Sequence, residues 1–165
     1  MNVEEASEAE LRAVFGPRAD YYVAQWQGTA RRASNWAAFW FSGAWLPFRR
    51  LYSVALIFYA AIAVESVLEE VVFRSIGYRE VPTAVNRAVS LACAIACGVW
   101  GNRWYLARVR RVISETRALA LPPEEHLREL GRRGGTRVWH AVAFLFVFVI
   151  VVVATFITLA VIQGE

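Results

Sequence analysis

The sequence predicts an all-α membrane protein with three transmembrane helices, an N-terminal amphipathic arm and an interfacial or re-entrant aromatic segment. Three observations predict this class. First, 58% of the 165 residues are hydrophobic and 14% are aromatic, which exceeds the apolar share of an ordinary soluble domain. Second, the apolar residues form long runs. Third, arginines and tryptophans flank these runs, as is typical of membrane-spanning segments.

Residues 1–33 are expected to form a cytoplasmic helical arm. Ser7 and Glu10 have the spacing of a capping box at the start of a helix. A second helix is predicted over "ADYYVAQW", because its apolar residues recur at helical spacing and share one face. The opening "MNVEEASEAE" is acidic and lacks the apolar core of a secretory signal peptide.

The stretch "SNWAAFWFSGAWLPFRRLY" is too interrupted for a core helix and too apolar for a loop. Residues 35–48 are predicted to lie flat at the membrane interface or to re-enter it, with Gly43 and Pro47 permitting a bend. The alternative is one straight span over residues 36–60. The tryptophans expected to act as interfacial anchors are Trp36, Trp40, Trp45, Trp100, Trp104 and Trp139.

Residues 34–165 are predicted to form the membrane domain, with spans at about 51–72, 82–105 and 138–162. The third span would be roughly 37 Å long at about 1.5 Å per residue, enough to cross a hydrocarbon core of about 30 Å. The link between the second and third spans begins as a basic helix continuous with the second span and is broken at Leu121-Pro122-Pro123.

The arginine distribution predicts the orientation. Six arginines precede the first span and nine lie between Arg103 and Arg137, whereas the loop between the first two spans has two. By the positive-inside rule the N-terminus and the long link face the cytoplasm. Three crossings then place the C-terminus on the opposite side.

Charged residues inside the predicted spans form a candidate intramembrane cluster of Glu65, Glu69, Glu70 and Arg87. Charges are costly in a bilayer, so intramembrane carboxylates usually have a partner or a role. One interpretation is a structural pairing of Arg87 with the glutamates that locks the first two spans together. The other is a proton or cation site.

The second span has small residues at intervals of four. This spacing lets helices approach closely and pack, so the span is expected to be the central helix. A two-cysteine set lacks the four ligands of a usual structural metal site, and no metal is expected. The two predicted packing rows are Ser90, Ala94 and Gly98, and Cys93, Cys97 and Gly101.

Five arginines near the predicted cytoplasmic surface are expected to contact anionic lipids or an acidic partner. They flank apolar segments, so no nucleic-acid partner is expected. His140 is expected to be an amphipathic anchor, with an axial haem or pigment ligand as the alternative; otherwise no cofactor and no catalytic residue are predicted. The five arginines are Arg49, Arg50, Arg108, Arg110 and Arg111.

Four stretches resemble a bacterial membrane family catalogued as domain of unknown function 2628. They are "FGPRADYYVAQW", "SNWAAFWFSGAWLPFRRLY", "GNRWY" and "GGTR", in the order that the family shows. Phe48 stands where the family usually has tyrosine, and Arg137 where it has serine. The resemblance implies a small helical protein of the bacterial inner membrane and brings no known catalytic residue.

Together these features predict a non-enzymatic accessory or scaffold subunit of a larger bacterial inner-membrane assembly, such as a respiratory or photosynthetic one. It would pack against other subunits through its transmembrane helices. The alternative is a small transporter or lipid-binding protein that uses Glu65, Glu69 and Arg87. A third hypothesis is a haem or pigment carrier that uses His140.

Overall fold

The computed structural model describes residues 6–29, 34–78, 80–136 and 138–163, and within them the regular structure is helical. In chain order the elements are α1 (Glu8–Phe15), η2 (Gly16–Arg18), α2 (Ala19–Trp26), α3 (Trp36–Phe41), η3 (Ser42–Ala44), α4 (Trp45–Phe48), α5 (Tyr52–Ser75), α6 (Thr83–Arg117), α7 (Pro123–Arg133) and α8 (Val138–Gln163).

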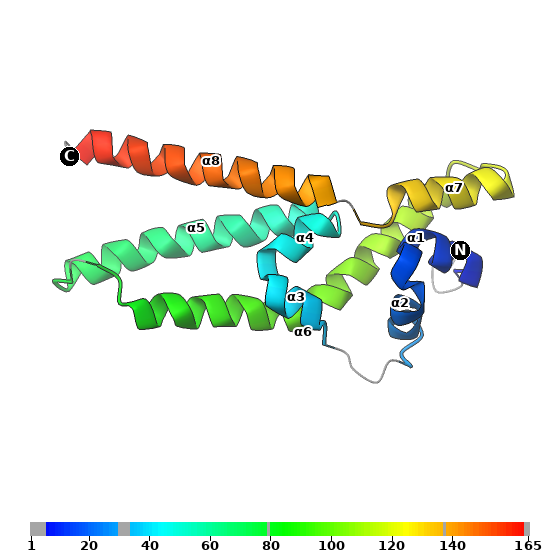
Figure 1. The fold of residues 1–165 in the computed structure, drawn as a ribbon, viewed down its shortest axis with the longest axis horizontal. Coiled ribbons are helices and arrows are strands. Elements are labelled where there is room, and N and C mark those ends of the chain that lie inside the picture. Colours follow the sequence, from blue (N-terminus) through cyan, green and yellow to red (C-terminus); the bar gives the residue numbers. More distant parts are fainter. Residues whose placement is uncertain (1–5, 30–33, 79, 137, 164–165) are drawn as a thin grey trace.

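The molecule has two parts (Figure 1). The helices α5 and α8 and the first half of α6, residues 83–97, extend in one direction. The helices α1, α2 and α7 gather around the second half of α6 at the other end. We call this second group the head. The turn between α5 and α6 lies at the end farthest from the head, as does the C-terminal end of α8.

The head has the packed core of a small helical domain. Leu11, Val14 and Phe15 of α1 are at most 3% exposed, as is Leu130 of α7. The predicted capping box at the start of α1 is present: the Glu10 amide donates to Ser7 Oγ at 3.2 Å, and the Ser7 amide donates to a Glu10 carboxylate oxygen at 2.9 Å. The predicted N-terminal arm is therefore packed against α6 and α7.

The helix α6 is continuous over 35 residues, from Thr83 to Arg117. It contains the predicted second span and the predicted basic helix that follows it. The helix ends before Ala120, whose φ of 48° is left-handed. Pro122 precedes α7 and Pro123 is its first residue, where a missing amide hydrogen is tolerated.

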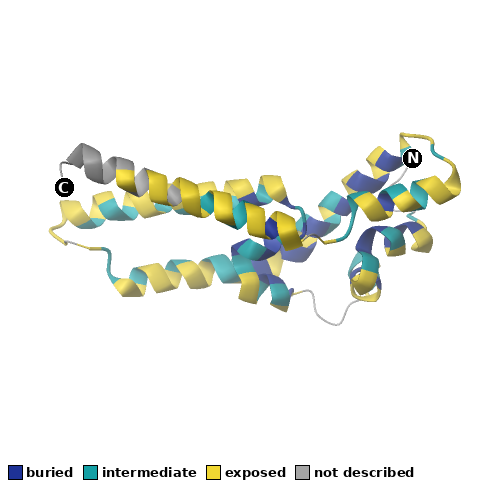
Figure 2. Cartoon of the chain, turned by 45° about the horizontal axis from the view of Figure 1, so that its top comes forward, coloured by how far each residue is buried: buried dark blue, intermediate teal, exposed yellow. Residues whose placement is uncertain are grey.

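The long helices expose their apolar side chains, in contrast to the head (Figure 2). On α8, Trp139 is 79% exposed and Phe146 is 66% exposed; on α5, Ile57 is 69% exposed. Within the described residues, two segments are long and apolar enough to cross a membrane: Thr83–Arg117, and Pro123–Val151, which takes in α7 and the first part of α8.

The prediction of three such segments is therefore wrong in its count. The helix α5 is 24 residues long, which is a sufficient length. However, its second half contains Glu65, Glu69, Glu70 and Arg74. These charges distinguish α5 from α8, whose sequence has no Asp, Glu, Lys or Arg.

The aromatic segment is bent rather than straight. Ser42, with a φ of 42°, separates α3 from the turn that leads into α4, and Arg50, with a φ of 58°, separates α4 from α5. The alternative of a single straight span over residues 36–60 is therefore wrong. Trp36, Trp40 and Phe41 are exposed on one side of the bend, whereas Leu46 is fully buried on the other.

Candidate functional site

The bent aromatic segment packs against the middle of α6, between the head and the long helices. We call this contact of α3, η3 and α4 with α6 the joint. A Cβ atom on Gly98 would lie 3.0 Å from the Phe39 Cβ, and one on Gly101 would lie 3.0 Å from the Ala38 Cβ. These distances are shorter than ordinary van der Waals contact, so a side chain at either position would push α3 away, and the two glycines permit the close approach of α3 to α6.

A chain of amide hydrogen bonds fixes the position of α3 at the joint. Asn35 caps α3, because its Oδ1 accepts from the Ala38 amide at 2.9 Å. Its Nδ2 donates to Asn102 Oδ1 at 2.8 Å, and Asn102 Nδ2 donates to Tyr21 Oη at 3.0 Å. The Asn35 amide also donates to the Gly98 carbonyl at 2.7 Å. These bonds connect α2, α3 and α6.

Arg49 is buried among aromatic rings at the joint and is only 4% exposed. Its guanidinium carbon lies 4.7 Å from the ring centre of Tyr22 and 4.9 Å from that of Tyr105. The rings of Trp45 and Phe48 are farther away, at 5.9 and 5.7 Å. Cation–π attraction offsets part of the cost of burying this charge.

Burial also affects the acid–base properties of the ring in closest contact with Arg49. Desolvation raises the pKa of Tyr22 to about 12, although the nearby Arg49 charge acts in the opposite direction. Tyr22 therefore stays a neutral phenol at physiological pH. Its face stays available to the guanidinium, and its ring stacks on Phe15 of the head core at 5.3 Å.

Arg50 and Arg108 converge on the C-terminal end of α7. Arg50 Nη1 donates to the carbonyl oxygens of Arg132 and Arg133 at 2.9 and 2.7 Å. Arg108 Nη2 donates to the same Arg133 oxygen at 3.2 Å. Cations at the C-terminus of a helix satisfy free carbonyls and oppose the helix dipole.

The arginine pair at 49–50 was predicted to contact lipid or a partner, and the structure gives these residues internal contacts. Arg49 is inside the aromatic cage and Arg50 caps α7. Of the other predicted contact residues, Arg110 lies 5.0 Å from the ring centre of Trp26. Arg111 is exposed on α6.

A second polar centre lies inside the head. Glu10 is 7% exposed, and its carboxylate accepts from Arg117 at 2.6 and 2.9 Å. His126 Nε2 lies 2.9 Å from the same carboxylate. Hydrogen bonding from Arg117, assisted by the Ser7 amide and His126, lowers the pKa of Glu10 to about 2 against the opposing effect of burial. One carboxylate thus connects α1, α6 and α7.

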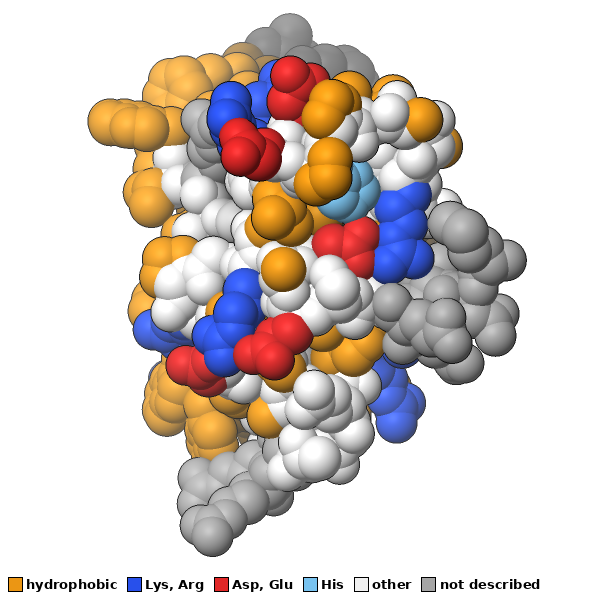
Figure 3. Space-filling view, turned by 90° about the vertical axis from the view of Figure 1, so that its right-hand side faces the viewer, with side chains coloured by type: hydrophobic (Ala, Val, Ile, Leu, Met, Phe, Trp, Pro, Cys, Tyr) orange, Lys and Arg blue, Asp and Glu red, His pale blue; other side chains and the backbone are white. Residues whose placement is uncertain are grey.

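The outer face of the head displays charges of both signs, with apolar side chains between them (Figure 3). Several are exposed ion pairs within α7 or α1, such as Glu124 with Arg128 and Glu8 with Arg12. Exposed pairs of this kind contribute little to stability. Glu10 differs from them because its carboxylate is shielded from solvent.

The predicted intramembrane charge cluster is not assembled as expected. Glu70 pairs with Arg74, four residues later on α5. Arg87 is exposed near the start of α6, and no ion pair within 4.0 Å joins it to Glu65, Glu69 or Glu70. Arg74 lies one helical turn from Glu70 and is therefore closer to it than Arg87 on the next helix. The sequence analysis did not consider this pair.

The predicted packing residues of α6 differ in burial along the helix. Cys97 is buried, with its sulfur 3.8 Å from Ser42 Oγ. Cys93 and Ala94 are half-buried, whereas Ser90 is exposed and donates to the Asn86 carbonyl of its own helix. Close packing is therefore confined to residues 97–101, and the helix in contact there is α3.

The predicted interfacial anchors also divide into two groups. Trp36, Trp40, Trp100 and Trp139 are between 45% and 79% exposed. Trp45 is only 3% exposed, because the absence of a side chain on Gly101 lets its ring lie against α6. Trp45 therefore belongs to the core of the joint, and its prediction as an anchor is corrected. Trp104 is half-buried.

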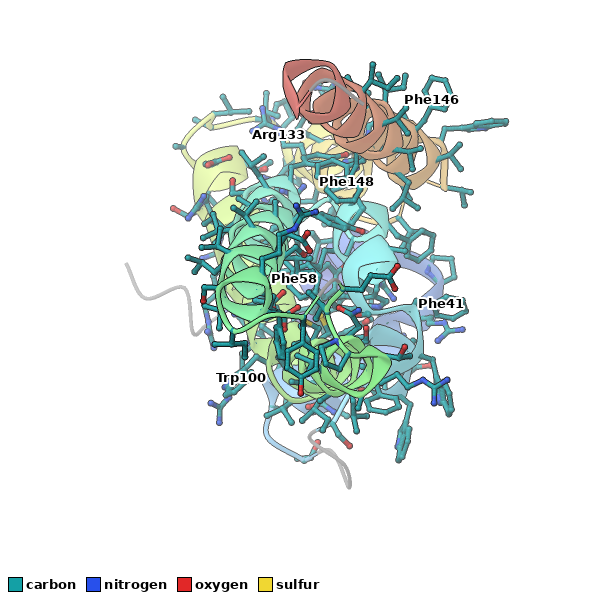
Figure 4. The ribbon with its side chains drawn as sticks, turned by 90° about the vertical axis from the view of Figure 1, so that its left-hand side faces the viewer. Phe41, Phe58, Trp100, Arg133, Phe146 and Phe148 are labelled. Atoms are coloured by element: carbon teal, nitrogen blue, oxygen red, sulfur yellow. The ribbon has the colours of Figure 1, made fainter. Side chains whose placement is uncertain are left out.

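Ring contacts connect α5 to α8 beyond the joint. Tyr59 lies 4.3 Å from Phe148 and 5.7 Å from Phe144, measured between ring centres. Nearer the head, the Tyr52 hydroxyl is hydrogen-bonded to His140 Nδ1. In Figure 4, Phe58 and Phe148 point between the helices, whereas Phe146 and Trp100 point outward.

Sequence reasoning missed the polar and aromatic partners that build the joint. Asn35, Asn102 and Tyr105 were not singled out, although each lies in a stretch that supported the family resemblance. A signal was present: Asn102 is an amide within an apolar helix, and Asn35 directly precedes a helix at a preferred capping position.

The stretches that support the resemblance meet in space. Tyr21 and Tyr22 come from the first stretch, the segment from Asn35 to Arg49 from the second, and Asn102 and Tyr105 from the third. The fourth stretch begins with Gly134, whose missing Cβ would lie 2.3 Å from the Val14 carbonyl oxygen. The first three build the joint, and the fourth attaches the end of α7 to α1.

These features define a small helical protein with a packed head and two segments able to cross a membrane. The chain belongs to the family described as protein of unknown function (DUF2628), which matches residues 5–111. The matched region includes the head helices α1 and α2, the whole joint and most of α6. No curated protein and no solved structure shows significant similarity to the chain.

Proposed function

We propose that this protein is a non-enzymatic accessory or scaffold subunit of a larger bacterial inner-membrane assembly. Its long helices would pack against membrane-embedded subunits, and its head would lie at the cytoplasmic surface. The observation that supports this most is the apolar surface of the long helices, which the chain itself leaves uncovered.

The uncovered surface favours a membrane over a soluble core. Only 17% of the most apolar window of α6 is buried, and the corresponding value for the segment that includes α8 is 6%. A core helix of a soluble protein would be largely covered by its neighbours. Exposed tryptophans near the joint, such as Trp40 and Trp100, fit the level of lipid headgroups.

The chain path supports a topology with α5 inside the membrane as well. The helix α6 begins at the end of the molecule farthest from the head, and the chain reaches that end through α5 (Figure 1). If α6 crosses the bilayer, α5 therefore crosses it too, with its glutamates in the half remote from the head. The N-terminus would then be cytoplasmic and the C-terminus periplasmic, in agreement with the arginine distribution.

The first half of α6 is the face we assign to a partner. Within the described residues, no ring contact, hydrogen bond or ion pair joins residues 83–96 to α5 or α8. Leu91 and Ile95 are 54% and 48% exposed there, and the small residues Ser90 and Ala94 would permit a close helix contact.

Native purification in a mild detergent, followed by mass spectrometry, tests this proposal. We expect other membrane proteins to co-purify in fixed ratio, and Ser90→Leu to release them by filling the close contact. Ala61→Leu, at an exposed position of α5, is the matched control and should retain them.

Two results would contradict the proposal. Purification of the chain alone as a homo-oligomer would favour the transporter or lipid-binding alternative. Absorbance from a bound haem or pigment would favour the role assigned to His140 in the third hypothesis.

A further inference from the structure

Two guanidinium groups share one carbonyl oxygen at the base of the head. Arg50 and Arg108 both donate to Arg133 O, at 2.7 and 3.2 Å. The C-terminus of a helix supplies about half a negative charge, which is less than the two positive charges placed there. The pair therefore retains an excess of positive charge.

Within the described residues, no acidic side chain forms an ion pair with Arg50 or Arg108, and none does so with Arg49. Glu115 lies 3.8 Å from the Arg133 guanidinium instead. The buried Arg49 adds a third positive charge nearby. Its guanidinium lies over the ring of Tyr105, and the charges of Arg50 and Arg108 also act on the Tyr105 hydroxyl.

The arginine pair also has unused donors and a strained backbone. A guanidinium has five N–H donors, and the hydrogen bonds of Arg108 to described residues are limited to one carbonyl. The Arg50 Nε is shielded from solvent and has no partner. Arg50 has a φ of 58°, a left-handed conformation that is costly for a residue with a side chain and is found at binding sites.

The surroundings indicate what kind of anion would fit. Arg50 lies two residues before the start of α5, and Arg133 lies five residues before the start of α8. Both helices begin with exposed apolar side chains: Leu56 is 65% exposed and Val138 is 62% exposed. An anion with attached acyl chains would bury such side chains, and a free inorganic ion would not.

From this arrangement we propose that Arg50 and Arg108 bind the phosphate of an anionic membrane phospholipid at the base of the head. Arginine suits this role because its planar donors match phosphate oxygens. The lipid would bridge the starts of α5 and α8 to the C-terminal end of α7. This inference rests on the membrane placement proposed above and adds a specific ligand to it.

Native mass spectrometry of the delipidated protein tests the site with defined probes. The probes are dioleoylphosphatidylglycerol, dioleoylphosphatidylcholine with the same acyl chains, and inorganic phosphate. We expect the wild-type chain to retain phosphatidylglycerol in preference to the other two. Arg108→Gln and Arg50→Gln should each weaken that binding about tenfold or more, as loss of a charge-assisted hydrogen bond predicts.

Arg103→Gln is the matched control, because Arg103 lies on the same helix, is exposed and has the same charge. It should leave phosphatidylglycerol binding unchanged. An equal loss in Arg103→Gln would show diffuse surface attraction and would overturn the proposal. Equal retention of phosphatidylglycerol and phosphatidylcholine by the wild-type chain would overturn it as well, even if an arginine variant failed to fold.

Tight binding of inorganic phosphate without retention of phosphatidylglycerol would contradict the assignment of a lipid as the ligand. These outcomes are separable from the proposed function. If partner subunits co-purify while the lipid preference is absent, only the lipid site fails. If the lipid preference is present while no partner co-purifies, only the accessory role fails.

Discussion

Glu10→Gln should destabilise the head in a pH-dependent manner. Lowering the pKa of this carboxylate from 4.5 to about 2 corresponds to about 3 kcal/mol of folding free energy, at about 1.4 kcal/mol per pH unit. Because the carboxylate is not wholly removed from solvent, we expect about 2 kcal/mol of this at pH 7. The contribution is complete above pH 4.5 and is lost as the pH falls toward 2, since protonation then costs the folded state its ion pair.

Thermal unfolding of the detergent-solubilised protein at pH 7, 4 and 3 measures this effect. The difference in midpoint between wild type and Glu10→Gln should be largest at pH 7 and should shrink at each lower pH. Glu124→Gln is the matched control, because that carboxylate is 87% exposed in its pair with Arg128; it should behave as wild type. A difference that stays constant from pH 7 to pH 3 would refute the assigned role of the Glu10 carboxylate.

Three further predictions concern the joint. Gly98→Leu and Gly101→Leu should each lower the yield of folded protein in detergent far more than Ala61→Leu, because even a Cβ atom at either glycine would lie only 3.0 Å from a Cβ atom of α3. Asn102→Leu should lower the unfolding free energy by about 1–3 kcal/mol, because it leaves the Nδ2 group of the buried Asn35 without its acceptor; chemical denaturation measures this. Arg49→Met keeps the length and removes the charge, so it should be tolerated better than Arg49→Ala, which leaves a cavity; thermal midpoints compare the two.

A specific result would contradict each of these predictions. Equal yields for Gly98→Leu, Gly101→Leu and Ala61→Leu would mean that α3 does not pack closely on α6. An Asn102→Leu variant as stable as wild type would show that the amide chain adds nothing to the joint. If Arg49→Met were no more stable than Arg49→Ala, filling the space of this side chain would contribute nothing to stability.

The helices could be predicted from the sequence because their signals are local. The capping box at Ser7, the long apolar run from Val138 and the proline pair at 122–123 each depend on neighbouring residues alone. The predicted start of the third span coincides with the start of α8, and α6 continues through the basic segment as expected. Three segments were predicted to be apolar enough to cross a membrane, and the described residues contain two, because the charges in the second half of α5 lower its hydropathy.

The joint could not be predicted, because its contacts connect residues far apart in the chain. Asn35 is hydrogen-bonded to Asn102, which is 67 positions away in the sequence. The rings in contact with the Arg49 guanidinium belong to Tyr22 and Tyr105. An arginine pair at the start of an apolar run is usually a boundary marker, and no local pattern distinguishes that role from a buried one. The charge pairing of Glu70 with Arg74 was local and could have been found by i, i+4 spacing.

Labelling of cysteines in the two halves of α6 tests the placement of the long helices in a membrane most directly. Native Cys93 is half-buried in the first half of α6, and Ser114 is exposed in the second half. With a membrane-impermeant maleimide applied to the cytoplasmic face of inverted membrane vesicles, Ser114→Cys should be labelled, whereas the native Cys93 and Cys97 should react only after denaturation in detergent. Labelling of Cys93 as fast as Ser114→Cys in intact vesicles would contradict the account, because the first half of α6 would then lie in water.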